Sequence, residues 1–262
     1  MKCDMIVRSP VILGDHNLMT GWRARIGFLV PPGNPTVEPE MTELAPPGVS
    51  VHFTRMSASG SAGDHAGQDE RTREQIASLD DATRLMAMIS PRAIVLAHTA
   101  TSYTLGRDAE AALVRRLEAS SGTKFVTAFG GVVEALRCLG VRRIAYATPY
   151  DEQLTERGRA HLTTLGLDVV GMARLEGVRN IYEETPARAY AVGRQADRPE
   201  AEAVFLSGTG MPTLSIVQAL EDDLGKPVIS AASAMMWAAL RAAGVSVRRP
   251  GYGLLFAGTG DQ

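Results

Sequence analysis

Short apolar runs alternate along the chain with longer segments in which apolar residues recur at helical spacing. The runs are rich in β-branched and aliphatic residues and end in polar or glycine-rich turns, which is typical of buried strands. The predicted strands are 26–30, 49–54, 93–97, 124–127, 143–147, 168–171, 203–206 and 227–230. The predicted helices are 68–89, 108–120, 131–139, 151–165, 185–196, 211–224 and 232–242. This alternation indicates an α/β fold in which crossover helices flank parallel strands.

The chain also repeats itself. Residues 122–141, GTKFVTAFGGVVEALRCLGV, and residues 225–245, GKPVISAASAMMWAALRAAGV, share the patterns G-x-x-V/I-x-A and ALR-x-x-GV. Two further pairs keep the same order: IGFLVPPGN, from Ile26, matches IAYATPYDE, from Ile144, and AIVLAHTATSY, from Ala93, matches AVFLSGTGMPT, from Ala203. Three pairs in one order indicate duplication of a unit of roughly 100 residues, the usual size of a domain.

The duplication predicts two pseudo-symmetric α/β lobes, each a parallel sheet with flanking helices, that face each other across an active site. We assign residues 22–127 and 230–262 to the first lobe and residues 128–229 to the second. Residues 1–21 are interpreted as an N-terminal extension and a candidate for disorder. Because ligands bind beyond the carboxyl ends of strands in open parallel sheets, the turns after the strands should converge on one cleft.

Two of these turns lie in the first lobe and are rich in hydrogen-bond donors. After the strand 26–30, three prolines and Gly33 restrict a turn that presents Asn34 and Thr36. These two residues are candidates for ligand binding, although a helix N-cap uses the same geometry. After the strand 93–97, the run HTATSY opens a helix with hydroxyl and N–H groups that suit a carboxylate. Its candidate binding residues are Thr99, Thr101, Ser102 and Tyr103.

The other two turns occupy the equivalent places in the second lobe. The third turn contributes Thr148 and Tyr150 from the run TPYD. The fourth, SGTGMPT, contains glycines that let the backbone approach a small ligand closely. Its candidate binding residues are Ser207, Gly208, Thr209 and Gly210. The turns contain neither G-x-G-x-x-G nor G-x-x-x-x-G-K, so a nucleotide is a less favoured ligand than a carboxylate.

His98 follows a predicted strand directly and is a candidate acid or base, because an ordinary histidine pKa of about 6.5 permits proton transfer at neutral pH. The alternative is a hydrogen-bonded structural histidine. The other histidines lack the spacing of metal ligands, so we predict no metal site. Cys138, in EALRCLG, is expected on the apolar face of a helix and therefore in the core.

Composition excludes several classes of protein. A net charge of −2 without a dense Lys/Arg tract lacks the footprint of a nucleic-acid-binding protein. No apolar run approaches the roughly 20 residues of a transmembrane helix, so we expect no membrane partner. The N-terminal segment lacks the apolar core and cleavage site of a secretory signal. Two cysteines are too few for a disulfide framework, and a reducing cytoplasm fits best.

At these turns the sequence resembles the aspartate/glutamate racemase superfamily, specifically its branch that contains arylmalonate decarboxylase and maleate cis-trans isomerase. The resemblance runs from about Ile26 to Phe256. IGFLVPPGNPTVEPE is similar to the opening strand and turn of that branch, and HTATSYTLG to the turn that carries a G-T-S loop or a cysteine. EALRCLGVRRIAYATPYDEQLTERG and RPGYGLLF most resemble the decarboxylases.

The resemblance implies two lobes with the site between them and a chemistry that needs neither metal nor cofactor. A small carboxylate substrate is then held by hydroxyl and backbone N–H groups that stabilise an enediolate-like anion, while one or two cysteines act on it. Homo-oligomers are common in the family, so a homo-oligomer is a candidate assembly. The binding residues carried over are Asn34, Thr99, Ser102, Tyr103, Tyr150, Asn180 and Thr209.

The chain departs from the family at both cysteine positions, in the turns after Leu96 and Leu206, where it has His98 and Gly208. Two-base racemisation and covalent thiol catalysis are therefore not expected. We predict a cofactor-independent lyase, most simply a decarboxylase, in which His98, Tyr150 or a bound water delivers one proton. The alternatives are a maleate-type cis-trans isomerase or another proton-transfer isomerase, and a carboxylate-binding protein that lacks catalysis.

Overall fold

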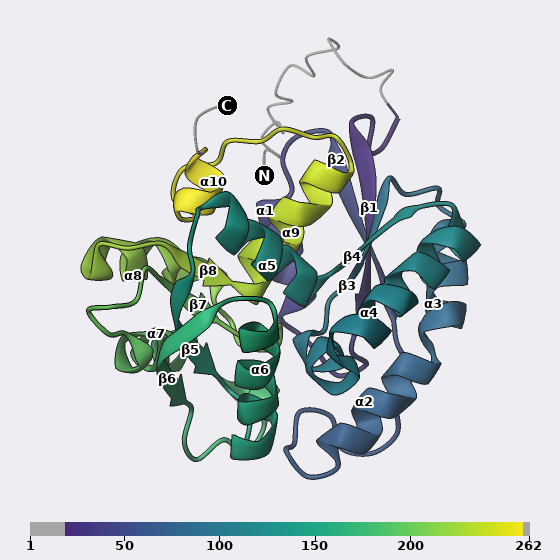
Figure 1. The fold of residues 1–262 in the computed structure, drawn as a ribbon. Helices are drawn as coiled ribbons and strands as arrows, with labels where there is room; N and C mark the ends of the chain where they lie inside the picture. Colours follow the sequence, from purple (N-terminus) through teal and green to yellow (C-terminus); the bar gives the residue numbers. More distant parts are fainter. Residues whose placement is uncertain (1–18, 259–262) are drawn as a thin grey trace, which may run out of the picture.

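The computed structural model describes residues 19–258, which form two four-stranded parallel sheets flanked by helices (Figure 1). The strands are β1 (Ala24–Val30), β2 (Val49–Arg55), β3 (Ala93–Leu96), β4 (Lys124–Thr127), β5 (Arg143–Thr148), β6 (Asp168–Arg174), β7 (Ala203–Leu206) and β8 (Val228–Ser230). The first sheet has the order β2-β1-β3-β4 and the second β6-β5-β7-β8. The equivalent order confirms the predicted fold class of two pseudo-symmetric parallel-sheet lobes.

Ten α-helices and two short 3-10 helices connect these strands within the described residues. They are α1 (Val37–Leu44), α2 (Gln68–Ala77), α3 (Leu79–Ala87), α4 (Thr99–Ser121), α5 (Ala128–Cys138), α6 (Glu152–Thr164), η1 (Ile181–Glu183), α7 (Pro186–Ala196), η2 (Leu214–Ile216), α8 (Val217–Leu224), α9 (Ala231–Ala242) and α10 (Leu254–Ala257). None of these described helices is both long and apolar enough to span a bilayer.

Helices α5 and α9 join the two lobes, and they belong to the repeated segments recognised in the sequence. They pack against each other and against strands of both sheets (Figure 1). Their backbones approach closely at Gly131, where an added Cβ would lie 2.9 Å from the carbonyl oxygen of Ala234. A larger residue at this position would push the helices apart, and with them the lobes.

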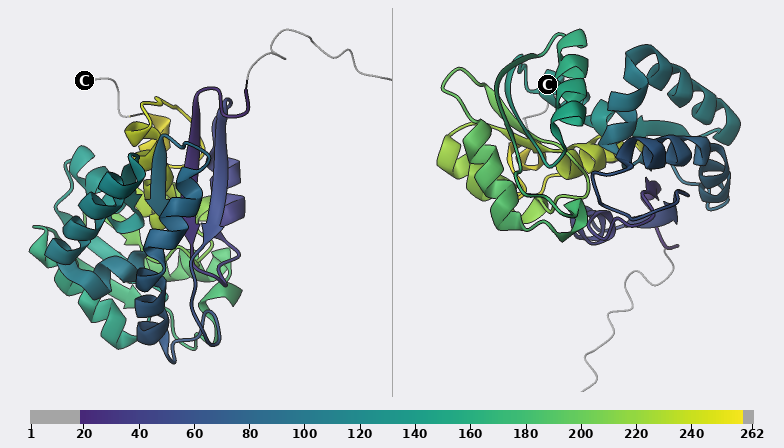
Figure 2. Two further views of the ribbon diagram at one scale, coloured as in Figure 1. Left: turned by 90° about the vertical axis from the view of Figure 1, so that its right-hand side faces the viewer. Right: turned by 90° about the horizontal axis from the view of Figure 1, so that it is seen from below.

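One hydrophobic cluster runs through both lobes and fixes their relative position. It includes Phe28 from β1, Tyr146 from β5, Phe205 from β7 and Phe129 from α5, all of them almost completely buried. The rings of Tyr146 and Phe205 stack with their centroids 5.6 Å apart. The two ends of the described chain lie at the same end of the molecule (Figure 2), where β1 begins. The carboxyl ends of the first sheet's parallel strands therefore point away from it.

Some predicted elements differ from the structure. The helix predicted over 68–89 is divided into α2 and α3 at Ser78, whose hydroxyl donates to the Gln75 carbonyl oxygen at 2.8 Å. The helix predicted over 108–120 is the second part of α4, which begins at Thr99 and is interrupted at Gly106, with φ 72° and ψ 173°. The helix predicted over 211–224 begins only at Leu214. Helix α1 was not predicted.

The predicted domain boundaries stay a prediction. Strands β1–β4 lie within residues 22–127, and β5–β8 end at Ser230, but the linking helices α5 and α9 contact both sheets. Assigning these helices to one lobe is therefore a matter of definition. Of the predicted extension 1–21, residues 1–18 lie outside the described residues.

Candidate active site between the lobes

The four predicted turns meet between the two sheets, where they follow the central strands β1, β3, β5 and β7. Thr36 Oγ1 donates to the Gly210 carbonyl oxygen at 2.9 Å and so joins the first turn to the fourth. Thr99 Oγ1 and the Tyr150 hydroxyl are 2.7 Å apart and join the second turn to the third. Thr209 Oγ1 donates to the Ala97 carbonyl oxygen at 2.8 Å and joins the fourth turn to the end of β3. The turns form one connected polar cluster.

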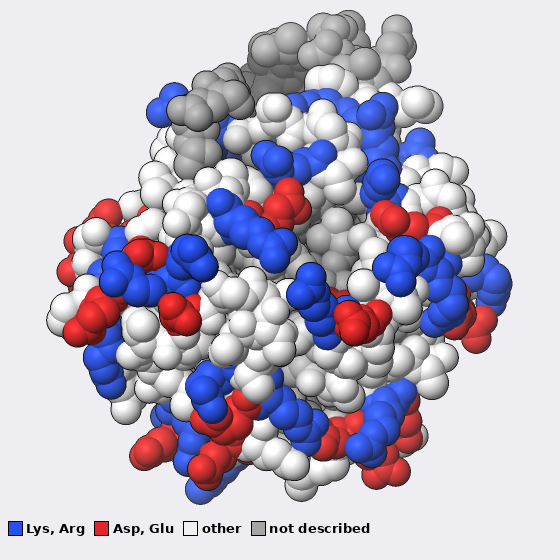
Figure 3. Space-filling view, in the orientation of Figure 1, with Lys and Arg blue, Asp and Glu red and all other residues white. Residues whose placement is uncertain are grey.

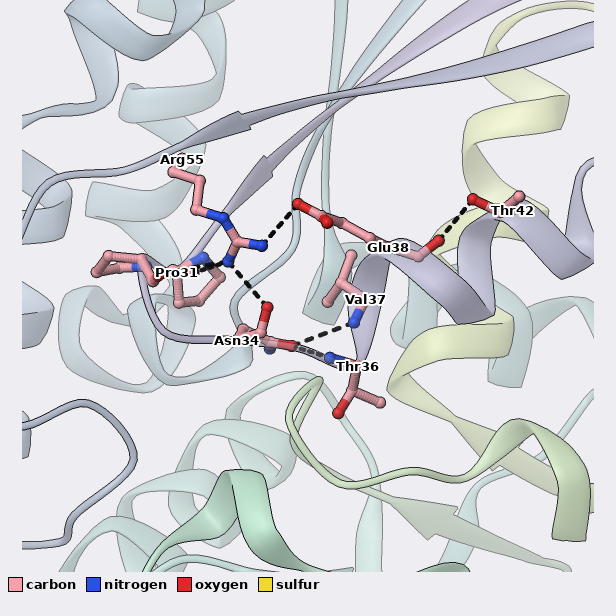
Figure 4. A network of polar contacts seen from close by, with 8 residues as sticks. Pro31, Asn34, Thr36, Val37, Glu38, Thr42 and Arg55 are labelled. Atoms are coloured by element: carbon pink, nitrogen blue, oxygen red, sulfur yellow. Dashed lines mark hydrogen bonds and ion pairs between the residues drawn. The ribbon is translucent and has the colours of Figure 1, made fainter.

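Asn34 has two functions in the first turn (Figure 4). Its Oδ1 accepts the backbone N–H of Thr36 at 2.8 Å and of Val37 at 3.1 Å, so this oxygen caps the start of α1. Its Nδ2 faces the other lobe, 3.5 Å from Thr209 Oγ1. The capping alternative therefore describes the oxygen of Asn34, whereas the amide nitrogen is the group directed toward the fourth turn.

Arg55, the last residue of β2, holds the backbone of the first turn (Figure 4). Its Nη1 donates to the carbonyl oxygens of Pro31 at 3.1 Å, Pro32 at 3.2 Å and Asn34 at 2.9 Å. Its Nη2 pairs with Glu38 Oε1 at 2.7 Å. A planar guanidinium can meet several acceptors in fixed geometry, so Arg55 fixes the turn that the prolines restrict.

The second turn begins with His98, the N-cap residue of α4. Its ring is 8% exposed, and Nδ1 lies 3.0 Å from Thr101 Oγ1. Burial lowers the pKa of His98 to about 4, so the imidazole is neutral at pH 7. The His98 side chain makes no capping bond, whereas side chains cap the starts of α5, α6, α7 and α9. The first N–H groups of α4 therefore lack a cap from this side chain, and N–H groups at a helix start are groups that can bind an anion.

Two buried tyrosines supply protonated hydroxyls to the cluster. Burial raises the pKa of Tyr150 and of Tyr103 above the ordinary tyrosine value. The Tyr103 hydroxyl lies 2.8 Å from Ser207 Oγ and links the second turn to the fourth. Thr148 Oγ1 accepts the backbone N–H of Tyr150 at 3.2 Å and holds the third turn. Both phenols keep their protons at neutral pH and are available as donors to a bound anion.

Gly208 gives the fourth turn its shape. Its φ is +91°, a conformation that residues with a side chain rarely adopt. A Cβ at this position would lie 2.8 Å from Pro149 Cγ and 3.5 Å from the Tyr150 hydroxyl. An ordinary side chain here would strain the backbone and displace Pro149, so the second lobe presents only main-chain groups at the position equivalent to His98 in the first.

Ser102 is directed away from the other turns. Its Oγ donates to Glu110 Oε1 at 2.6 Å, and Thr127 Oγ1 donates to the same oxygen at 2.6 Å. His161 Nε2 lies 3.6 Å from the other carboxylate oxygen. Burial opposes ionisation of Glu110, but these neighbours outweigh it and lower its pKa. The hydroxyl of Ser102 therefore supports α4 across the break at Gly106.

Segments 57–67 and 176–185 cover the cluster. Asn180 Nδ2 donates to the Ala62 carbonyl oxygen at 3.0 Å, and Ile181 N donates to the Gly63 carbonyl oxygen at 2.9 Å. Asn180 thus joins the two segments rather than the four turns. The Tyr182 ring packs over Gly33 and Gly210, where an added Cβ would meet it at 3.3 Å and 2.7 Å. It is the aromatic side chain that closes the space above the first and fourth turns.

Three residues of the site were not predicted. Arg55, Glu40 and Glu110 contact the turns from neighbouring elements, and Glu40 Oε1 accepts the backbone N–H groups of Thr213 and Leu214. Arg55 stands at the end of a predicted strand, which is a signal that could have identified it. Glu40 and Glu110 lie on helices among other acidic residues, and no sequence pattern distinguishes them.

The prediction for Cys138 was wrong. Cys138 is the last residue of α5 and is exposed. The buried face of α5 carries Val132, Val133 and Leu136, whereas Glu134 lies on the same exposed side as Cys138.

Within residues 19–258 no cluster of three His, Cys, Asp or Glu side chains is placed to hold a metal ion. Basic and acidic side chains are interspersed on the face drawn in Figure 3.

Comparison with known proteins identifies similar chains over almost the whole length. Residues 26–256 match the family model of arylmalonate decarboxylase. The arylmalonate decarboxylase of Bordetella bronchiseptica is 30% identical over 88% of this chain and 95% of its own length. The maleate isomerase of Nocardia farcinica is 32% identical over 88% of this chain and 94% of its own length.

A solved structure agrees with both the fold and these matches. It is a mutant of the Nocardia farcinica maleate cis-trans isomerase with a covalently bound succinylcysteine intermediate. It superposes with a TM-score of 0.81 and 27% identity, over 89% of this chain and 98% of that chain. The crystal structure of an arylmalonate decarboxylase superposes with a TM-score of 0.73 and 28% identity, over 88% of this chain and 98% of that chain, so both kinds of enzyme share the two-lobed architecture described above.

Proposed function

The chain belongs to the arylmalonate decarboxylase family, and from this premise we propose that it is a cofactor-independent lyase that removes CO₂ from a small malonate-type acid. The observation that carries the proposal is the asymmetry of the site. His98 stands at the end of β3, while the equivalent turn of the second lobe has Gly208, where a side chain would strain the backbone. Such a site has an imidazole in the first lobe and no side chain at the equivalent position of the second, which favours protonation of the reacting carbon from one face.

The first step is binding of one substrate carboxylate. Its proposed donors are the N–H groups at the start of α4 and one hydroxyl of the Thr99–Tyr150 pair, whose mutual hydrogen bond uses the proton of the other hydroxyl. Backbone groups of the fourth turn approach from the other lobe. Because the tyrosine hydroxyl stays protonated, the site stabilises negative charge without a cation.

The second step is cleavage of the bond between the α-carbon and the other carboxylate, which leaves as CO₂. The electron pair of that bond enters the retained carboxylate and forms an enediolate. Donors fixed around this oxygen pair stabilise the charge as it develops. The α-carbon then takes one proton, so a malonate dianion and one proton give CO₂ and a monocarboxylate.

His98 is the proposed proton donor for that last step. In the free protein its imidazole is neutral, because burial lowers its pKa. A bound dianion acts in the opposite direction, since a nearby negative charge favours the protonated imidazole. Substrate binding thus favours the imidazolium form of His98, which gives its proton to the enediolate, and the Tyr150 hydroxyl or a bound water is the alternative donor.

A maleate-type isomerase is the second candidate, because a maleate isomerase is among the similar proteins. The covalent succinylcysteine in the related structure requires a thiol nucleophile. Among the described residues the cysteine of this chain is Cys138, exposed at the end of α5. We therefore rank the isomerase below the decarboxylase, and a binding protein without catalysis third.

The test compares His98→Ala with the wild-type protein on malonate, 2-substituted malonates and maleate. We expect decarboxylation by the wild type, a loss of about a hundredfold or more in turnover for His98→Ala, and largely retained binding of malonate. His52→Gln, on β2 and bonded to Ser50, serves as the matched histidine control. Full activity of His98→Ala would remove His98 from the mechanism, and conversion of maleate alone would favour the isomerase.

A further inference from the structure

Glu40 is a buried carboxyl group at the junction of the two lobes. It lies on the inner face of α1, and only 8% of the residue is exposed. Its Oε1 accepts the backbone N–H groups of Thr213 and Leu214, at 2.7 Å and 2.8 Å. Its Oε2 is buried and makes no hydrogen bond with any described residue. Glu40 belongs to the first lobe by sequence, but both of its hydrogen bonds are made with residues of the second lobe.

The two N–H groups that Glu40 binds belong to Thr213, the last residue of the fourth turn, and to Leu214, which follows it. They stand at the start of η2, which leads into α8, and such N–H groups have no partner within their own helix. Thr213, the N-cap residue of η2, makes no side-chain cap. Glu40 therefore caps this helical segment from outside, and the positive end of the helix favours a carboxylate there.

A second contact from α1 reaches the same segment. Thr36, one helical turn before Glu40, donates its hydroxyl to the Gly210 carbonyl oxygen at 2.9 Å. Helix α1 thus binds the segment 210–214 at both of its ends, once as a donor and once as an acceptor. The glycine-containing part of the fourth turn, residues 207–210, leads directly into this clamped segment.

Ser207 and Thr209 hold the first part of the fourth turn through hydrogen bonds to Tyr103 and Ala97. Gly208 and Gly210 carry no side chains, so the end of the turn that leads to η2 depends on the contacts that α1 makes with it. At the same time a buried carboxyl group is costly, because burial penalises its charge. An apolar side chain would fill the same space with a smaller penalty in folding free energy. A buried carboxyl group next to the fourth turn therefore indicates a role beyond packing.

We propose that Glu40 is a positioning residue that holds the fourth turn of the second lobe in register with the first lobe, so that the turn's backbone can meet a carboxylate. The inference rests on the proposed function for its effect on turnover. Its effect on the backbone is independent of the reaction.

The experiment compares Glu40→Met, which fills the same space without an acceptor, with Glu40→Gln, which keeps an acceptor oxygen. Glu43→Gln, on the exposed side of the same helix, is the control. For each variant we would measure amide hydrogen exchange over residues 207–216, malonate affinity and kcat and KM. For Glu40→Met we expect exchange at Thr213 and Leu214 to rise about tenfold or more, with kcat/KM reduced about tenfold to a hundredfold.

For Glu40→Gln we expect values within about threefold of the wild type, because its side-chain oxygen accepts the same two N–H groups. Thr36→Val provides a second route should Glu40→Met not fold, since it loosens the same segment at Gly210 while Glu40 stays intact. We expect faster exchange over 210–214 and weaker malonate binding in that variant as well.

Two outcomes would overturn the proposal: wild-type turnover and malonate affinity in a folded Glu40→Met variant, or a Glu40→Gln variant as impaired as Glu40→Met. Failure of the proposed function has a different signature. If the wild type turned over no malonate, the exchange rates and malonate affinities would still decide the role of Glu40.

Discussion

At the residue scale, the proposed chemistry depends on His98. Among the described residues no charged side chain bonds to it, and its shift in pKa comes from burial. Its pKa is lower in the folded protein than in the unfolded chain. At pH values between these two pKa values, the unfolded chain binds the proton of His98 and the folded protein does not. His98 therefore costs stability as pH falls from about 6.5 to about 4, and none of this cost is present at neutral pH.

The titration of His98 gives a prediction that does not depend on turnover. Followed by NMR through its ring protons, His98 of the free protein should titrate near pH 4. With saturating malonate its pKa should rise by about one unit or more, because the bound anion favours the imidazolium. His52, which bonds to Ser50, is an internal control. An unchanged His98 pKa would show that the bound carboxylate does not lie close to His98.

Gly208 is the residue that distinguishes the second lobe from the first. We expect Gly208→Ala to lower the free energy of unfolding by about 1–3 kcal/mol, because it combines positive φ with a contact on Pro149. Gly166→Ala is the matched control, since Gly166 has φ +82° but nothing within 4 Å of an added Cβ. Denaturant unfolding measures both. Equal losses would show that the contact with Pro149 has no effect.

At the element scale, the strands follow the sequence closely and the helix boundaries do not. Buried strands such as Ala203–Leu206 are continuous apolar runs, and apolar burial alone predicts them. The breaks at Ser78 and Gly106 depend on a local hydrogen bond and on one backbone conformation, which periodicity does not report. Helix α1 was missed because it is short and prolines surround it.

Helix α1 shows how an element can link stability to pH. Burial raises the pKa of Glu40 to about 7, although the backbone N–H groups of Leu214 and Thr213 oppose the shift. The folded protein therefore binds this proton more tightly than the unfolded chain. The associated stability is complete below about pH 4.5 and is lost as pH rises through about 7, to an extent of about 3 kcal/mol.

Glu40→Gln should remove that dependence. We expect the difference in unfolding free energy between Glu40→Gln and the wild type to grow in favour of the variant from about pH 5 to about pH 8. Denaturant unfolding at several pH values measures the difference, and groups common to both proteins cancel. A difference that does not change with pH would show that Glu40 titrates in its ordinary range.

At the scale of the whole molecule, the duplication explains why the meeting of the four turns at the candidate site could be predicted from the sequence. Four turns at equivalent strand ends must meet when two similar lobes face each other, and Thr36, Thr99 and Thr209 all bond across turns. The particular partners could not be predicted, because they depend on the angle between the lobes. That angle is set by the packing of α5 on α9, where a single glycine, Gly131, controls the approach.

Residues that act from outside the turns mark the limit of sequence reasoning. Glu110 and Arg55 support the second and first turns from a helix and a neighbouring strand. Their roles require knowledge of which elements lie side by side. Asn180, expected among the binding residues, instead joins the two covering segments, so its contact with a ligand stays a prediction.

The central claim is a site that binds a carboxylate between the lobes and delivers a proton from one side. The most direct test is to incubate the protein with a 2-substituted malonate in D₂O and to follow CO₂ release and the product by NMR. We expect one deuterium at the α-carbon, a single enantiomer of the product, and loss of this activity in His98→Ala. A racemic product, or maleate converted to fumarate without any release of CO₂ from malonates, would contradict it.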